Sequence, residues 1–256
     1  MKGNKYSKSR KASDSTYINV YGKHTVNQAI EKVPASIKRV YITEKFQDKK
    51  LLAKLKRLGC SLSPLVETKM PEGIRRTDNH QGVVAQLDPQ DIICTLEEFL
   101  PQASTESVVL VLSEIQDPQN VGAVIRSAVA FGVEAVIFPD HRQSPITGTV
   151  AKVSAGMVFS IPLVKTKNVN NVLQTLQKNK FTVYGLAGDG EHSLYETSLT
   201  GPTALVVGNE AIGLREKTRS ICDKLIYIPT NPQCESLNAA SAVTATLAVL
   251  RSQTVV

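Results

Sequence analysis

The sequence predicts an α/β fold in which a mostly parallel sheet forms the larger, C-terminal part and a small α/β module precedes it. In residues 107–256, strand-like apolar runs alternate with helix-like stretches, which is typical of a parallel sheet covered by helices on both faces. Residues 17–87 show a similar alternation over a shorter length. In addition, three strand ends carry Gly, Asn, Glu or Ser where a helix begins, and ligands bind outside the carboxyl ends of strands in such sheets.

The elements of the small module follow from its hydrophobic periodicity. Helices place apolar residues three or four positions apart, and strands are short runs rich in β-branched residues. The second helix would present a basic face. We predict helices at 24–32 and 48–58, and strands at 37–42, 61–66 and 82–87.

The larger part has longer apolar runs, as expected for strands that are buried on both faces. Helical stretches separate most of these runs, so the strands can lie parallel to one another. We predict strands at 108–112, 135–138, 160–164, 182–186, 204–207 and 225–228. We predict helices at 122–130, 168–178, 214–221 and 237–250.

Composition divides the chain into four segments. Residues 1–16 are rich in lysine and are expected to form a basic flexible tail, which can contact phosphates or keep the chain in solution. Residues 17–87 form the small module. Residues 88–106 mix Pro, Ser, Thr and acids around a short helical patch and are predicted to be the interdomain linker. Residues 107–256 form the larger domain.

The positive charge lies in the first third of the chain. Residues 1–87 contain 18 Lys and Arg against 7 Asp and Glu, a net charge of +11, whereas residues 88–256 contain 12 against 16, a net charge of −4. A basic module joined to an acidic one indicates that the basic part binds a polyanion and that the acidic part has a different function. A solvated, lysine-rich surface is the alternative that charge alone leaves open.

Several classes of protein are disfavoured. The four cysteines (Cys60, Cys94, Cys222 and Cys234) are scattered, so we expect no metal site, no disulfide framework and a reducing compartment, the cytoplasm. No apolar run is long enough to span a membrane, and no signal peptide is predicted. The glycine-rich stretch 185–190 follows a strand but is not GxGxxG, which argues against a dinucleotide-binding dehydrogenase.

The first polar strand end is Asp117-Pro-Gln-Asn120, which leads into a helix. Asn120 is a candidate N-cap of that helix, and Gly122 allows another backbone to approach closely. Arg126 follows Asn120 by six residues. On local sequence alone, Asn120 and Arg126 fit either a structural or a functional role.

The other two strand ends have a similar mixture of roles. Gly208 and Gly213 permit tight contact with a flat ligand. Glu210 lies between them and has two possible roles: it can bind a hydroxyl or a base, or it can stabilise a helix N-terminus. Ser236 is a candidate N-cap of the last helix. That helix is rich in alanine, so it can pack closely within the fold or across a dimer.

Taken together, these segments resemble the SpoU (TrmH-like) family of RNA ribose 2′-O-methyltransferases. The family patterns are Asn-x-Gly-x-x-x-Arg, Gly-x-Glu-x-x-Gly, and Ile-Pro followed by Ser-Leu-Asn. They match Asn120, Gly122 and Arg126; Gly208, Glu210 and Gly213; and Ile228, Pro229, Ser236, Leu237 and Asn238. Tyr21-Gly22-x-His24 and 80–84 are similar to the substrate-binding module of the subgroup that modifies large-subunit rRNA. Pro232 departs from the glycine that many members have.

The resemblance implies the fold and the donor. It implies a C-terminal α/β knot, a deep trefoil in which the C-terminal segment passes through an earlier loop, and a homodimer with the active site near the interface. Three loops would surround S-adenosylmethionine, with no metal. The residues implied for donor binding are Leu186, Ala187, Gly188, Val207, Gly208, Asn209, Ile228, Ser236, Leu237 and Asn238.

The resemblance also implies the reaction, which is methyl transfer to a ribose 2′-hydroxyl of RNA. Arg126 would stabilise the developing alkoxide and grip the adjacent phosphate, or act as the base. The implied partners in catalysis are Asn120 and Ser236, which orient Arg126 and the ribose, Glu210, which positions substrate, and Asn238, which helps to hold the donor. The expected substrate is a guanosine in large-subunit rRNA. The alternatives are a tRNA 2′-O-methyltransferase and a non-catalytic RNA-binding or ribosome-assembly protein with the same fold.

Overall fold

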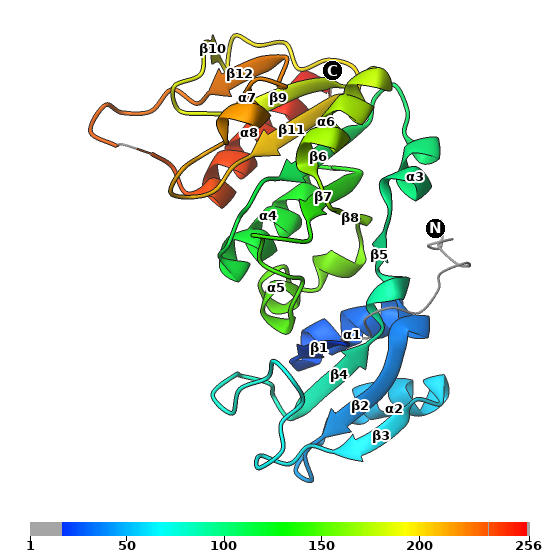
Figure 1. Cartoon of the computed structure of the whole chain (residues 1–256). Coiled ribbons are helices and arrows are strands. Elements are labelled where there is room, and N and C mark those ends of the chain that lie inside the picture. The colour runs from blue at the N-terminus through cyan, green and yellow to red at the C-terminus, as the bar shows by residue number, and fades with distance from the viewer. Residues whose placement is uncertain (1–16, 235, 255–256) are drawn as a thin grey trace. The chain divides into compact units, whose positions relative to one another are not determined.

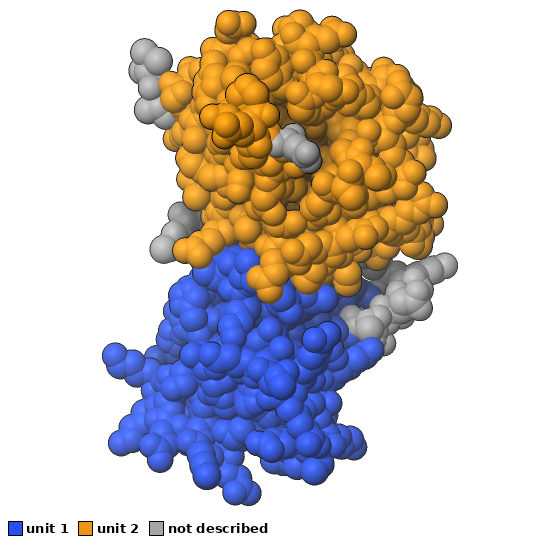
Figure 2. Space-filling model, turned by 90° about the vertical axis from the view of Figure 1, so that its left-hand side faces the viewer, with its two compact units in different colours: residues 1–94, 146–160 blue, residues 95–145, 161–256 orange. Residues whose placement is uncertain are grey.

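The computed structural model describes residues 17–234 and 236–254. The tail predicted for residues 1–16 lies outside this part. The chain forms two compact units, which Figure 2 shows in different colours. Unit 1 contains Met1–Cys94 and Ile146–Ser160, and unit 2 contains Thr95–Pro145 and Ile161–Val256. The boundary after Cys94 falls inside the segment that we predicted as the linker.

Unit 1 is built on a four-stranded sheet with the order β1-β4-β2-β3. Strand β4 pairs antiparallel with both of its neighbours, and β2 pairs parallel with β3. Half of the buried residues of β1 and β4 are β-branched, which suits a pleated, covered surface. The strands are β1 (Ile18–Tyr21), β2 (Ile37–Ile42), β3 (Ser61–Pro64) and β4 (Val83–Leu87).

Two helices of unit 1 lie close to their predicted positions, α1 at Lys23–Lys32 and α2 at Lys49–Leu58. Asp48 caps α2 by accepting a hydrogen bond from the Leu51 N–H, and Gly59 ends it in the left-handed conformation. Leu51 and Leu55 are buried one turn apart, whereas most of the lysines of α2 are exposed. The amphipathic helix with a basic face is therefore confirmed.

Residues 146–160 form a segment of unit 1 that the sequence did not predict. It contains the helix α5 (Gly148–Val153) and the 3-10 turn η4 (Met157–Phe159). A Cβ at Gly148 would lie 2.4 Å from the Asn19 carbonyl oxygen, so glycine is required for α5 to approach β1 so closely. The helix is too short to show a clear apolar period, so we placed these residues with the rest of 107–256.

Unit 2 is built on a parallel sheet, as predicted. The strand order runs β10-β12-β9-β11-β6-β7-β8, and every pairing along it is parallel. The bounds are β6 (Val108–Leu112), β7 (Ala135–Pro139), β8 (Leu163–Thr166), β9 (Thr182–Leu186), β10 (His192–Ser193), β11 (Thr203–Val207) and β12 (Lys224–Tyr227). Strands β7 and β11 are buried along their whole length.

The helices of unit 2 flank this sheet (Figure 1). They are α3 (Leu96–Phe99), α4 (Pro118–Ala130), α6 (Val169–Lys178), α7 (Glu216–Arg219) and α8 (Ala239–Thr254). Helices α4 and α8 pack together, and the hydroxyls of Ser127 and Thr244 are 2.7 Å apart across this contact. Short elements complete the chain: η1 (Pro34–Ser36), η2 (Pro89–Asp91), β5 (Ile93–Cys94) and η3 (Leu100–Gln102).

Some predicted bounds are wrong by several residues. The strand predicted at 160–164 begins only at Leu163, because Pro162 cannot donate a hydrogen bond to a neighbouring strand. The helix predicted at 214–221 is one short turn, Glu216–Arg219. Within the described residues, no helix is both long enough and apolar enough to cross a membrane.

Candidate active site and donor-binding loops

The side chain of Asn120 links the three polar strand ends. Asn120 is 8% exposed, its Nδ2 donates to Glu210 Oε1 at 2.8 Å, and its Oδ1 accepts from Asn238 Nδ2 at 2.8 Å. These residues are 90 and 118 positions away in the sequence. The fold therefore assembles one hydrogen-bonded chain, Asn238–Asn120–Glu210, from all three motifs.

Asn120 is not the N-cap of α4, so that prediction is wrong. Helix α4 begins at Pro118, and Asp117 is the cap, because its Oδ1 accepts from the Gln119 N–H at 2.8 Å. Proline at the first position loses no helical hydrogen bond. Asn120 therefore lies within the first turn, where its amide faces Glu210 and Asn238.

Asn238, rather than Ser236, caps the last helix. Its Oδ1 accepts from the Ala240 N–H at 2.9 Å, while its Nδ2 donates to Asn120. Ser236 is exposed, and no hydrogen bond joins its side chain to another described residue. The predicted cap was thus wrong by two residues. Both ends of the Asn238 amide are occupied, so the start of α8 is held against α4.

Arg126 lies further along α4 and is exposed. Among the described residues it forms no hydrogen bond or ion pair. Six residues correspond to about one and two-thirds turns of an α-helix, so Arg126 lies on another side of α4 than Asn120. The structure thus does not join Arg126 directly to the Asn238–Asn120–Glu210 chain, and its guanidinium is available to a ligand.

The loops predicted to bind the donor meet at one edge of the sheet. Strands β12, β9 and β11 are adjacent and parallel, so their carboxyl ends lie side by side. The Ala187 N–H donates to the Ile226 carbonyl oxygen at 3.0 Å, which ties the loop after β9 to β12. Of the residues predicted for the donor, this edge carries Leu186, Ala187, Gly188, Val207, Gly208, Asn209 and Ile228.

Two glycines show what this edge can hold. A Cβ on Gly208 would lie 2.3 Å from the Gly213 carbonyl carbon, so the turn between them closes only with glycine at this position. Asn209 and Gly213 exchange two backbone hydrogen bonds across the same turn. A Cβ on Gly188 would meet no atom within 4 Å. The loop after β9 therefore leaves open backbone against which a flat ligand can lie.

The loop before Ser236 accommodates Pro232 in a turn. The Cys234 N–H donates to the Asn231 carbonyl oxygen at 2.8 Å, and the Asn231 side chain accepts from the Gln233 N–H at 2.9 Å. Proline is favoured at the second position of such a turn because its ring presets the backbone angle. The departure from glycine at this position is consistent with an ordered turn.

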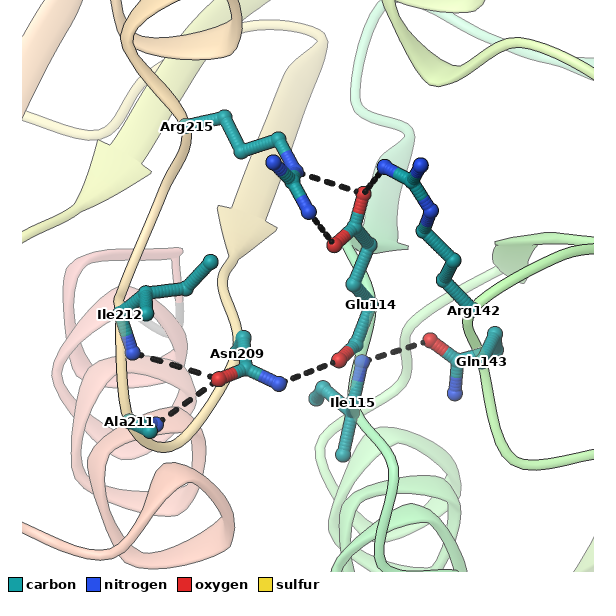
Figure 3. Close-up of polar contacts among 8 residues, drawn as sticks. All are labelled: Glu114, Ile115, Arg142, Gln143, Asn209, Ala211, Ile212 and Arg215. Carbon is teal, nitrogen blue, oxygen red and sulfur yellow. Dashed lines mark hydrogen bonds and ion pairs between the residues drawn. The ribbon is translucent and has the colours of Figure 1, made fainter.

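The side chain of Asn209 forms hydrogen bonds to other parts of the protein. As Figure 3 shows, its Oδ1 accepts from the N–H groups of Ala211 and Ile212, and its Nδ2 donates to the Glu114 carbonyl oxygen at 2.9 Å. These bonds shape the loop after β11 and fasten it to the segment that follows β6. The polar atoms of the Asn209 side chain are therefore already paired within the protein.

Glu114 is a residue that the sequence analysis missed. It lies two residues after the end of β6, and its backbone has a φ of 68°, which is uncommon for a residue with a side chain. Arg215 donates to both of its carboxylate oxygens at 2.8 and 2.7 Å, and Arg142 lies 3.8 Å away. Figure 3 shows the two arginines reaching Glu114 from different loops. A single acidic residue two positions after a buried strand was the available sequence clue.

The ion pair of Glu114 predicts a pH dependence of stability. The hydrogen bond from Arg215 lowers the pKa of Glu114 below its usual value of 4.5, and the charges of Arg215 and Arg142 act in the same direction. A lowered pKa in the folded state stabilises the fold above pH 4.5, and this stabilisation is lost as the pH falls through the lowered pKa. We expect the Tm difference between wild type and Glu114→Gln to be largest near neutral pH and to shrink below pH 4.5. A constant difference down to pH 3 would contradict this assignment.

A second ion pair holds the loop after β9. Arg219 donates to both carboxylate oxygens of Asp189, at 2.9 and 3.0 Å, and this bond lowers the pKa of Asp189. Because the pair is on the surface, its loss should have a modest effect. We expect Arg219→Ala to weaken donor binding by about 2- to 5-fold, measured by calorimetric titration with S-adenosylmethionine. Lys217→Ala, on the same short helix, is the control, and equal losses in both variants would refute the role of the pair.

Two free cysteines lie close to this edge, the exposed Cys234 and the partly buried Cys222. Cys222 is packed next to Gly185, and burial raises the pKa of its thiol to about 11, so it stays protonated at neutral pH. Within residues 17–234 and 236–254, no group of three or more His, Cys, Asp or Glu side chains is arranged to hold a metal ion. The motif residues supply amide, carboxylate, hydroxyl and guanidinium groups at Asn120 and Asn238, Glu210, Ser236 and Arg126.

Two family models match the chain. The SpoU rRNA Methylase family matches residues 107–248, and the family described as RNA 2′-O ribose methyltransferase substrate binding matches residues 19–92. The 23S rRNA (guanosine-2′-O-)-methyltransferase RlmB of Vibrio cholerae is 36% identical over 228 residues, covering 87% of this chain and 92% of the relative. RlmB of Escherichia coli K12 is 33% identical over 245 residues, covering 87% and 93%.

Solved structures show the same fold. The SpoU methyltransferase AviRb from Streptomyces viridochromogenes, in complex with the cofactor AdoMet, has a TM-score of 0.81 at 22% identity and covers 93% of this chain and 91% of AviRb. The TrmH/SpoU tRNA modifying enzyme of A. aeolicus has a TM-score of 0.53 at 24% identity and covers 62% of this chain and 83% of that enzyme.

The two family matches and the RlmB relatives show that the chain is an S-adenosylmethionine-dependent RNA ribose 2′-O-methyltransferase. The two family matches together span most of the sequence from residue 19 to residue 248. This chain belongs to the SpoU rRNA methylase family.

Proposed function

We propose that this protein methylates the ribose 2′-hydroxyl of a guanosine in 23S rRNA. The observation that carries this proposal is the hydrogen-bonded chain Asn238–Asn120–Glu210, which joins the three family motifs at the carboxyl edge of the sheet. The target class is supported by the RlmB relatives, which are 33–36% identical over most of their length. We also propose the cytoplasm as the compartment, where four free cysteines are expected to stay reduced.

The donor loops fit S-adenosylmethionine. Leu186 to Gly188, Val207 to Asn209, and Ile228 to Asn238 would surround it, with open backbone at Gly188 and a glycine turn at Gly208. The donor supplies a methyl group on a positively charged sulfonium. The protein's task is therefore mainly to bring the acceptor oxygen into line with that methyl group, and correct positioning of two reactants can contribute about 7–11 kcal/mol.

Arg126 is the proposed catalytic residue. An arginine side chain keeps its positive charge in proteins and donates several hydrogen bonds in a fixed plane. It would stabilise the negative charge that develops on the 2′-oxygen and bind the phosphate next to it. Its lack of an ion pair among the described residues leaves these donors available. A substrate phosphate would accept the hydroxyl proton if no protein base does.

The remaining motif residues position the reactants. Glu210 is exposed but anchored through Asn120, so one of its carboxylate oxygens can accept a hydrogen bond from the ribose. Asn238 holds Asn120 and the start of α8, next to the loop that would hold the donor. Ser236 is exposed and its hydroxyl can orient the ribose or contact the donor.

RNA binding is assigned to residues 17–87, and methyl transfer to residues 107–256 with 88–106 between them. Lys49, Lys50, Lys56 and Arg57 are exposed on α2, and such a basic helix face supplies the phosphate contacts that dominate affinity. The family match over residues 19–92 supports this assignment. The segment Ile146–Ser160 belongs structurally to unit 1 and is an exception to the division by sequence.

The knot and the homodimer are further parts of the proposal. The chain leaves β12 near one edge of the sheet and returns as α8 to pack against α4, which follows β6. This path is the one expected if the segment before α8 passes through an earlier loop. Ile212 and Leu237 are 60% and 39% exposed near the motif loops. Apolar groups exposed there support an interface between two copies of the chain.

The coverage of relatives favours rRNA over tRNA as the substrate. The structures described as tRNA enzymes cover 59% and 62% of this chain, whereas the RlmB relatives cover 87%. The basic N-terminal unit is thus shared with rRNA-directed relatives. A non-catalytic RNA-binding protein with this fold is disfavoured, because Asn120, Arg126 and Glu210 are all present.

The test is a methyl-transfer assay on unmodified rRNA. The purified protein is incubated with S-adenosylmethionine carrying an isotopically labelled methyl group, and the RNA is then hydrolysed in alkali. A 2′-O-methyl group blocks cleavage, so we expect label in alkali-resistant dinucleotides that contain guanosine. Label in mononucleotides would indicate base methylation and refute the proposal. If tRNA is labelled and rRNA is not, the tRNA alternative is correct.

A further inference from the structure

A pocket of about 470 Å³ opens beside the donor edge, at the ends of β6, β7 and β8. It lies entirely within unit 2. The loops after these three strands and the N-terminal part of α7 line it. None of the residues predicted for catalysis or donor binding is among those that line it. The pocket is therefore distinct from the residues assigned to catalysis and to the donor.

The charge of the pocket favours an anion. Arg142, Lys167 and Arg215 line it, and Glu114 is the one carboxylate among the described lining residues. Both carboxylate oxygens of Glu114 already accept hydrogen bonds from Arg215. Lys167 is exposed and forms no ion pair with a described residue, and Arg142 is 67% exposed in its side chain and only 3.8 Å from Glu114. Positive charge thus remains after the internal pair is made.

The walls of the pocket are held in place before any ligand binds. Glu114 fixes Arg215 through two hydrogen bonds (Figure 3). Thr218 donates to the Asn170 side chain at 3.0 Å, which joins α7 to the start of α6. Asn168 caps α6, so the positive end of that helix also faces the pocket. A preformed site loses less conformational entropy when it binds.

The pocket does not suit the methyl donor. S-adenosylmethionine carries a positive sulfonium and a positive ammonium against one carboxylate, so a lining with three cations repels it. A phosphodiester has one negative charge and several acceptor oxygens, which match guanidinium and ammonium donors.

The pocket adjoins the candidate active site. The Gln116 N–H lies 3.5 Å from Glu210 Oε2, and Gln116 is two residues after Glu114 in the same segment. The Glu114 carbonyl oxygen also accepts from Asn209 in the loop after β11. An RNA strand whose ribose lies at Glu210 can therefore place a neighbouring phosphate in the pocket.

We propose that the pocket formed by Arg142, Lys167 and Arg215 binds a backbone phosphate of the substrate RNA next to the methylated nucleotide. This inference rests on the proposed function, because it assigns the RNA of that reaction to the pocket. It places Arg142 and Lys167 as positioning residues that hold the RNA across the edge of the sheet. They would act on RNA affinity, and the donor would bind independently of them.

The experiment compares Arg142→Ala and Lys167→Ala with the control Lys178→Ala, which removes one exposed lysine from the other end of α6. In the pocket variants, KM for in vitro transcribed 23S rRNA should rise several-fold with little change in kcat or in donor affinity. The slope of log K against log salt for RNA binding should fall by about 0.7–0.9 for each lost phosphate contact. Arg142→Lys should retain most of the slope, because it keeps the charge.

Two outcomes would overturn the inference. One is an equal loss of RNA affinity in the pocket variants and in Lys178→Ala. The other is binding of inorganic phosphate in a calorimetric titration that the pocket variants abolish while RNA affinity stays unchanged, since this would assign the pocket to a small anion. Thermal melts check that each variant folds. If the wild type transfers no methyl group to rRNA, the proposed function fails, whereas the salt dependence still reports on the pocket.

Discussion

Replacing Arg126 with alanine is expected to reduce methyl transfer to RNA by about 10²–10³-fold, the usual loss when a group that stabilises a developing oxyanion is removed. Folding should be unaffected, because Arg126 is exposed and has no hydrogen-bonding partner among the described residues. Binding of S-adenosylmethionine should also be unchanged, because the donor loops lie at other strand ends. Single-turnover kinetics and donor titration measure the two effects separately.

The control for Arg126 is Arg126→Lys, which keeps a positive charge but has no planar pair of donors. If the main role of Arg126 is to bind the phosphate, Arg126→Lys should recover part of the methyl-transfer activity. If its main role is to stabilise the oxyanion through the guanidinium, Arg126→Lys should recover little. A parallel loss of donor binding and of transfer in Arg126→Ala would show that the residue supports the fold of the donor site. In that case its assignment as a catalytic residue is wrong.

Replacing Gly208 with alanine is expected to abolish donor binding and to destabilise the protein. The new Cβ would lie 2.3–2.5 Å from backbone atoms of Gly213 and Leu214, and these atoms cannot move without opening the turn. Overpacking of this kind typically costs about 1–3 kcal/mol, and a protein of this size loses about 2–4 °C in Tm for each kcal/mol. Thermal melts and calorimetric titration with S-adenosylmethionine measure the two losses.

The matched control is Gly188→Ala, because the same added methyl group would meet no atom within 4 Å there. Its Tm should stay close to that of wild type. Any loss of donor affinity in this variant would then indicate that S-adenosylmethionine contacts the loop after β9. A similar fall in Tm for both variants would show that the close contact at Gly208 is relieved by movement of the chain.

Much of the fold could be predicted from the sequence, because its strands are apolar runs with clear ends. Strands β6 and β9 lie where their runs of apolar residues predicted them. The helix α5 was missed because its stability comes from contact with β1, and its closest contact, between Gly148 and Asn19, joins residues far apart in the sequence. Such a contact leaves no periodic pattern in a helix of six residues.

The candidate site was predictable in its residues but not in its hydrogen bonds. Asn120 was expected to cap a helix, yet Asp117 takes that role and the Asn120 amide connects Glu210 with Asn238. Local rules describe which residue types can cap a helix, and both Asp117 and Asn120 satisfy them here. Glu114 was missed because its importance comes from Arg215, which lies 101 positions later.

The segment Ile146–Ser160 has a consequence for how this protein folds during synthesis. Unit 1 cannot be complete when Cys94 leaves the ribosome, because α5 and η4 are made only after β6, α4 and β7 of unit 2. Domains usually fold in order from the N-terminus as they emerge. Here the nascent β1 would keep an uncovered surface until the segment Ile146–Ser160 is complete, 66 residues after Cys94. We therefore expect a ribosome-bound chain ending before residue 146 to remain sensitive to protease, and one that exposes residue 160 to become resistant within unit 1.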